Sequence, residues 1–156
     1  MGKDIKSYLD SLRNEKFRSV ILYHSSQAEM DLFLKKLSEM INARLIELSI
    51  LFKDSKDLCS QLDRFNISDL KQLIQKHAVN EEIAIITGMG FLWDTWDTDD
   101  RKNLLNLVRN QWNSYYTETH AGLVFGLPED AIVTESNIID NKGENRVLSL
   151  NQINAF

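Results

Sequence analysis

The segment from residue 91 to residue 100 concentrates more chemically capable side chains than any other part of the chain. It reads Phe-Leu-Trp-Asp-Thr-Trp-Asp-Thr-Asp-Asp and follows a run of apolar residues that ends at Gly88-Met89-Gly90. Carboxylates are the ligands that hard divalent cations prefer, so a metal site is one interpretation. Its ligands would come from four aspartates, namely Asp94, Asp97, Asp99 and Asp100. Their spacing does not match the calcium loop of an EF-hand.

Two other interpretations of the same segment stay open. The tryptophans can be core residues, with the aspartates capping the helix that follows. Alternatively the segment is a protein-binding edge, because tryptophan is enriched at interface hot spots and nearby acids select a basic partner. The candidate residues for this protein-interaction site are Trp93, Asp94, Trp96 and Asp97.

The other candidate groups for catalysis or metal binding are weaker. His24 follows an apolar run, where a catalytic base is often found, but only Ser25 and Ser26 stand beside it as nucleophiles. Neither the three histidines nor Cys59 shows the ligand spacing of a zinc site. A single cysteine excludes an internal disulfide and is typical of a reducing compartment. We therefore expect no catalytic residue, no metal and no cofactor.

Apolar periodicity predicts how these residues are positioned. Helical spacing over 5–12, 26–41, 54–79 and 98–112 predicts helices, with residues 54–79 forming one or two of them and the second capped at Ser68. Short β-rich runs at 20–23, 44–48, 83–87 and 122–126 predict strands. Residues 138–140 and 146–150, with a turn at 141–144, predict a terminal β-hairpin.

Strands that alternate with helices predict parallel βαβ units. We expect one domain over residues 1–156, a three-layer α/β/α sandwich with a mostly parallel sheet and a C-terminal hairpin. This layout is that of a P-loop nucleotide-binding domain. Such a domain needs glycines and a lysine after its first strand, followed by Ser or Thr for magnesium. Here that position reads His-Ser-Ser-Gln-Ala-Glu-Met-Asp, and the strand 83–87 ends in Thr87 instead of a carboxylate. The nucleotide site is therefore expected to be degenerate.

Composition limits the remaining classes of function. The net charge is −5 and no cluster of Lys or Arg stands out, so direct nucleic-acid binding is not favoured. No apolar run approaches the roughly 20 residues that span a bilayer, and the charged first residues lack a signal core. We expect a cytoplasmic protein that does not enter a membrane.

Residues 86–93, Ile-Thr-Gly-Met-Gly-Phe-Leu-Trp, resemble a segment of BrxB-type proteins, which are small components of the BREX bacterial phage-defence systems. The run at 20–23, the run from Gly122 to Pro128 and the final Asn154-Ala155-Phe156 follow the same order as in that family. The resemblance covers about three fifths of the chain in layout. It implies a non-catalytic relative of AAA-type ATPase domains that works with larger proteins of the same gene cluster.

The leading hypothesis is thus a non-enzymatic adaptor subunit of a bacterial anti-phage complex. A metal-dependent hydrolase or nuclease using the loop 94–100, with His24 nearby, is the first alternative. A regulatory subunit of the AAA clamp-loader type is the second.

Overall fold

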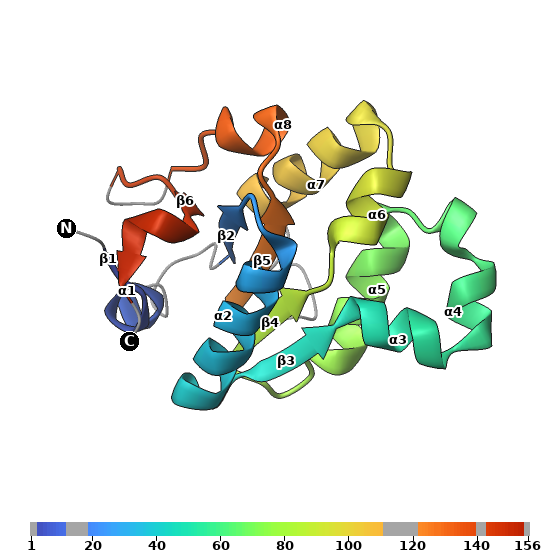
Figure 1. Cartoon of the computed structure of the whole chain (residues 1–156), viewed down its shortest axis with the longest axis horizontal. Helices are drawn as coiled ribbons and strands as arrows, with labels where there is room; N and C mark the ends of the chain where they lie inside the picture. Colours follow the sequence, from blue (N-terminus) through green and yellow to red (C-terminus); the bar gives the residue numbers. More distant parts are fainter. Residues whose placement is uncertain (1–2, 12–18, 111–121, 140–142, 155–156) are drawn as a thin grey trace.

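The computed structural model describes residues 3–11, 19–110, 122–139 and 143–154 (Figure 1). Its centre is a sheet of five parallel strands in the order β3-β4-β5-β2-β6. The strands are β2 (Ser19–His24), β3 (Arg44–Glu47), β4 (Ile83–Thr87), β5 (Gly122–Pro128) and β6 (Val147–Ser149). Four of the five match the predicted apolar runs, and the prediction of a parallel α/β sheet is confirmed.

Helices cover both faces of this sheet. They are α1 (Ile5–Ser11), α2 (Gln27–Ile41), α3 (Leu48–Asp54), α4 (Lys56–Ser60), α5 (Ile67–His77), α6 (Gly90–Thr95), α7 (Thr98–Asn110) and α8 (Ala131–Thr134). Two 3₁₀ turns, η2 (Leu62–Arg64) and η3 (Leu150–Gln152), complete the described helical elements. Among these helices, none combines the length and the hydrophobicity that crossing a bilayer requires.

Each face of the sheet has its own core, because successive side chains of a strand point to opposite faces. Val20 and Leu22 of β2 pack with α1 and α2, whereas Ile21 between them packs with the helices of the other face. That second and larger core receives side chains from α5, α6, α7 and α8. The layers seen in Figure 1 follow from this alternation.

The contact between α2 and β5 depends on one glycine. A Cβ atom at Gly126 would lie 2.5 Å from Leu34 Cδ1 and 3.1 Å from Met30 Cγ. Both of these α2 side chains are buried. The missing side chain therefore lets α2 lie close against the middle of the sheet.

The long predicted helical region between the second and third strands is divided differently from the prediction. A separate helix, α3, follows β3 directly, and the last helix of the region is capped by Asn66 instead of Ser68. The Asn66 side chain accepts a hydrogen bond from Asp69 N (3.0 Å), and the Asp69 carboxylate accepts one from Asn66 N (3.1 Å). This reciprocal pair satisfies two amide groups that a start at Ser68 would leave unpaired.

The predicted terminal hairpin is wrong in its pairing. Its arms meet, within the described residues, at a single antiparallel bridge between Ile139 and Asn145. The second arm instead becomes β6 and joins the sheet parallel to β2, with Ile21 opposite Val147. The last described residues form β7 (Ile153–Asn154), which pairs with β1 (Lys3–Asp4) in a separate parallel ribbon.

Candidate functional site

The carboxyl ends of the parallel strands form the edge where ligands bind in open α/β sheets. The chain leaves β2 toward α2 on one face, and it leaves the adjacent β5 toward α8 on the other face. The crevice between the ends of these two strands is the topological switch point, the usual place for a ligand. His24 ends β2 there and Pro128 ends β5, and the two residues are paired in register.

The connection from β2 to α2 is a turn of two residues, Ser25 and Ser26. Ser26 is the N-cap of α2, and its hydroxyl accepts a hydrogen bond from Glu29 N (3.2 Å). Its own amide donates to His24 Nδ1 at 2.9 Å. A loop that cradles phosphate needs several free backbone amides. Two of the amides that such a loop would use, those of Ser26 in the turn and Glu29 in the first turn of α2, already have partners inside the protein.

The charges around the turn are also unsuited to phosphate. Because the Ser26 amide is always a donor, Nδ1 of His24 is the unprotonated nitrogen in this arrangement, and the proton lies on Nε2. Nε2 is 3.4 Å from Glu29 Oε2. Asp31 follows on α2 and accepts a hydrogen bond from Gln27 Nε2 (3.0 Å). Two carboxylates therefore lie in the first turns of the helix that would have to receive an anion.

The end of β4 offers no acid for a magnesium ion. The strand ends in the buried Thr87. Gly88 follows in a left-handed conformation (φ 73°), and a Cβ there would lie 2.8 Å from Ser49 N. Gly90 begins α6, with Gln27 Oε1 3.3 Å from the position of its absent Cβ. The Gly-Met-Gly segment is thus a tight turn packed against α3 and α2.

The two tryptophans of the candidate interaction site lie inside the molecule. Trp93 is 2% exposed and Trp96 is 4% exposed, so neither indole offers a surface to a partner. Trp96 Nε1 donates to Phe65 O at 2.7 Å in the core. Trp93 Nε1 donates to Asp130 Oδ2 at 3.2 Å. Their placement corresponds to the core interpretation of this segment.

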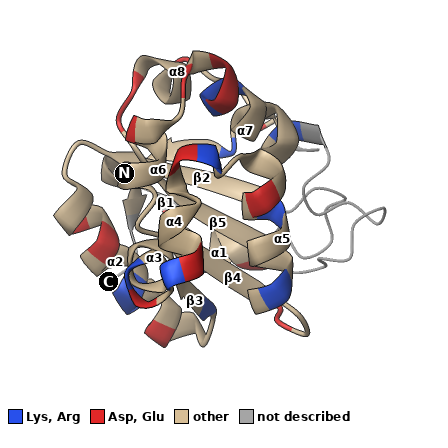
Figure 2. Cartoon of the chain, turned by 90° about the vertical axis from the view of Figure 1, so that its right-hand side faces the viewer, with Lys and Arg blue, Asp and Glu red and all other residues tan. Residues whose placement is uncertain are grey.

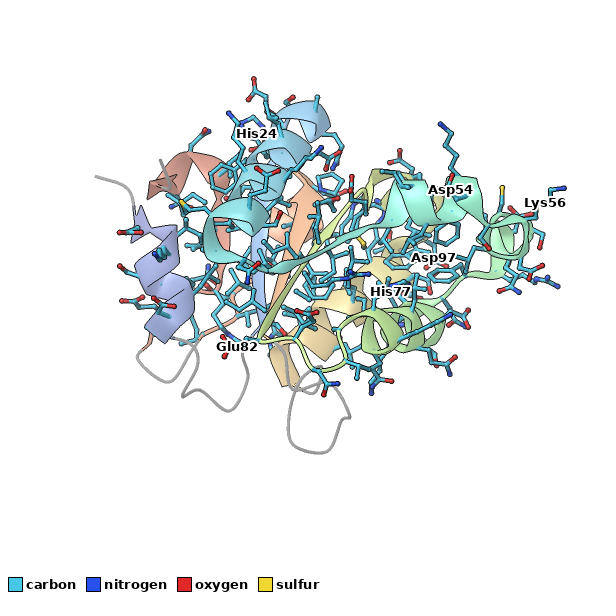
Figure 3. The ribbon with its side chains drawn as sticks, turned by 90° about the horizontal axis from the view of Figure 1, so that it is seen from below. His24, Asp54, Lys56, His77, Glu82 and Asp97 are labelled. Carbon is cyan, nitrogen blue, oxygen red and sulfur yellow. The ribbon has the colours of Figure 1, made fainter. Side chains whose placement is uncertain are left out.

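Three of the four aspartates of the same segment, Asp97, Asp99 and Asp100, lie at the start of α7. Asp97 Oδ1 accepts a hydrogen bond from Asp100 N (2.9 Å), which makes Asp97 the cap of that helix. Asp94 is exposed on α6. Within the described ranges, no three His, Cys, Asp or Glu side chains form a group that could hold a metal ion. His24 and Asp97 also lie well apart, on different elements (Figure 3).

A cluster around Asp130 was not expected from the sequence. Asp130 Oδ2 accepts hydrogen bonds from Trp93 Nε1 and from Arg101 Nη1 (3.3 Å), and its Oδ1 caps α8 by accepting from Ile132 N (2.8 Å). Arg101 Nε donates to Trp93 O (2.8 Å), and its guanidinium lies 5.4 Å from the centre of the indole. An aspartate before Ala-Ile-Val is a recognisable cap, but nothing local to it points to Trp93.

Charged side chains are interspersed over the helices, with acidic and basic residues alternating in the view of Figure 2. Comparisons with protein-family models, curated proteins and solved structures give no significant match.

Proposed function

We propose that this protein is a non-catalytic interaction subunit, built on a P-loop-like domain whose nucleotide site is degenerate. The observation that carries the proposal is the two-residue turn between β2 and α2, with the Ser26 amide held by His24 Nδ1. That turn occupies the position at which a P-loop domain binds phosphate. A domain that keeps this layout and fills the site with its own side chains has a scaffold suited to binding other proteins.

Three further features support the proposal. Glu29 and Asp31 place negative charge at the start of α2, which opposes an incoming phosphate. β4 ends in Thr87, which cannot orient magnesium as a carboxylate does. Gln27 packs over Gly90 and spans the gap between α2 and α6. The negative charges on α2 and the missing carboxylate after β4 act independently against nucleotide binding.

The partners we propose are larger proteins encoded in the same gene cluster, in the cytoplasm of a bacterium that carries an anti-phage system. This part of the proposal rests on the resemblance of residues 86–93 to BrxB-type proteins. A regulatory subunit of the AAA clamp-loader type would share the same degenerate site. The identity of the partners separates these two roles.

The first experiment is a calorimetric titration of the full chain with ATP and ADP, each with and without magnesium. We expect no heat of binding up to about 1 mM nucleotide, which corresponds to less than about 4 kcal/mol of binding free energy. A micromolar Kd for either nucleotide would refute the degenerate site. The second experiment is purification of the tagged protein from its native host at native expression. Stable recovery of gene-cluster neighbours is the expected result, and a protein recovered alone argues against the adaptor role.

A further inference from the structure

We propose that the groove between α7 and α8 is the docking site for an acidic peptide segment of a partner protein. The proposal rests on the interaction role proposed above and names the surface that performs it. The groove has a volume of about 520 Å³, within the range of protein sites that bind small ligands or single segments. Because Trp93 and Trp96 are buried, this surface takes the place of the one expected from the sequence.

The groove has an apolar floor and a polar rim. Its floor is formed by Leu105 of α7, which is buried, and by Ile132 of α8, which is partly buried. The lining residues of α7 run from Thr98 to Arg109. Successive lining residues are four, three, one and three positions apart, and this spacing places them on one face of the helix. That face is about 16 Å long, the length of about five residues of extended peptide. The occupant is therefore a short extended segment with apolar side chains.

The charge of the groove's rim determines which sign of charge the occupant carries. Lys102 and Arg109 line the groove from α7, and Glu135 is the one acidic residue among its lining residues. The groove thus carries an excess of positive charge in a chain whose net charge is −5. Within the described part of the chain, Lys102 forms no salt bridge, so its ammonium group is available to a carboxylate. Carboxylates that alternate with apolar side chains match this surface.

Both ends of the groove are fixed before any partner arrives. At one end the ion pair between Arg101 and Asp130 (3.3 Å) holds the start of α8 against α7. At the other end Arg109 Nη2 donates to Asn137 O (3.2 Å), just beyond α8. A site held in this way loses little conformational freedom on binding, which favours affinity. Figure 1 shows α7 and α8 lying next to each other at one end of the molecule.

The test is an NMR titration of the full chain with two synthetic peptides, acetyl-Glu-Leu-Glu-Leu-Glu-amide and its counterpart with lysine in place of glutamate. We expect the acidic peptide to cause saturable shifts in the amides of α7 and α8, and the basic peptide to cause none. Raising the salt concentration should weaken binding, since exposed charges are screened. Absence of saturable shifts up to about 1 mM acidic peptide, or shifts on another surface, would overturn the proposal.

Two variants with the same change of charge sharpen the test. Lys102→Glu should weaken the binding of the acidic peptide by about five- to tenfold, because an attractive charge pair becomes a repulsive one. Lys36 lies on α2, which packs against the opposite face of the sheet. Lys36→Glu should therefore leave the affinity for the acidic peptide unchanged. Equal effects of the two substitutions would show that only net charge matters, and would also overturn the proposal.

The test of the groove and the tests of the proposed function can fail independently of each other. If gene-cluster proteins co-purify equally with the wild type and with Lys102→Glu, the groove is not the docking site and the adaptor role stands. If the protein binds ATP or is recovered alone, the adaptor role fails, whatever the peptides do.

Discussion

The Nδ1 atom of His24 accepts a hydrogen bond of 2.9 Å from the backbone amide of Ser26, two residues along the chain. This bond closes the turn at the switch point of the sheet and leaves the Ser26 amide unavailable to a ligand. The bond also takes the place of one half of a capping box, in which the Glu29 carboxylate would accept from the Ser26 amide. Glu29 N donates to the Ser26 hydroxyl, while the Glu29 carboxylate lies near His24 Nε2.

The role of His24 predicts a difference between two substitutions. His24→Asn should keep the turn, because an asparagine oxygen can accept from the amide two residues on. His24→Leu should lose that bond and destabilise the protein by about 1 kcal/mol. Chemical denaturation of both variants measures the difference, with Ser25→Ala as a control in the same turn. Equal stability of the Asn and Leu variants would show that the imidazole contributes only packing.

The two glycines of the Gly-Met-Gly segment should respond very differently to alanine. At Gly88 the positive φ is unfavourable for a side chain, and the new Cβ would meet the Ser49 backbone at 2.8 Å. We expect Gly88→Ala to cost more than about 2 kcal/mol of stability.

Gly90→Ala is the matched control for that substitution. Its Cβ would lie 3.3 Å from Gln27 Oε1, the end of a side chain that can move. Gly90 also begins a helix, where alanine is favoured over glycine by up to about 1 kcal/mol. The stability of the Gly90→Ala variant should stay within about 0.5 kcal/mol of that of the wild type in thermal or chemical denaturation. A comparable loss of stability in both variants would contradict the distinction between a glycine that the turn requires and a glycine that alanine can replace.

The class of fold was predictable from the sequence because it depends on local patterns. The apolar runs at 20–23 and 83–87 have no polar member before their last residues, as strands buried on both faces require. Ser26 was recognisable as a cap by its position before an amphipathic helix. Such signals lie within a few residues of the elements that they define.

What could not be predicted depends on contacts between distant residues. β6 pairs with β2 across a separation of 126 positions, from Ile21 to Val147, and the local sequence around Val147 equally suits a hairpin arm. The burial of Trp93 depends on Arg101 and Asp130, which reach it from other elements. The spacing of apolar and polar residues carries no information about such partners, so the tryptophans could be assigned either to the core or to a surface.

Asp94 and Asp97 belong to the same acidic segment, and they should differ in their effect on stability. Asp97 caps α7 through Asp100 N, whereas Asp94 is exposed on α6. We expect Asp97→Ala to destabilise the protein by about 1 kcal/mol and Asp94→Ala to have little effect. Thermal denaturation of the two variants, with and without magnesium or manganese, tests both points. A metal-dependent rise in Tm that either substitution removes would instead support the metal-site hypothesis.

His77 should make the stability of the protein sensitive to mild acid. Burial, then the positive charges of Arg44 and Lys76, lowers the pKa of its imidazole below the ordinary value of 6.5. Near that pH the unfolded chain therefore binds more protons than the folded one, so stability falls as the pH drops below about 6.5. The contribution is fully present above the unfolded pKa and is lost progressively as the pH falls toward the folded one.

An NMR titration of the imidazole signals measures this pKa directly. Arg44→Gln should raise the pKa of His77 only part of the way to 6.5, because burial is the larger cause and remains. Lys36→Gln, which removes a positive charge from α2, should leave it unchanged. Denaturation of His77→Gln between pH 5 and 7 should show a smaller loss of stability on acidification than the wild type. A His77 that titrates at 6.5 or above, in the wild type and in Arg44→Gln alike, would contradict both the burial and the charge arguments.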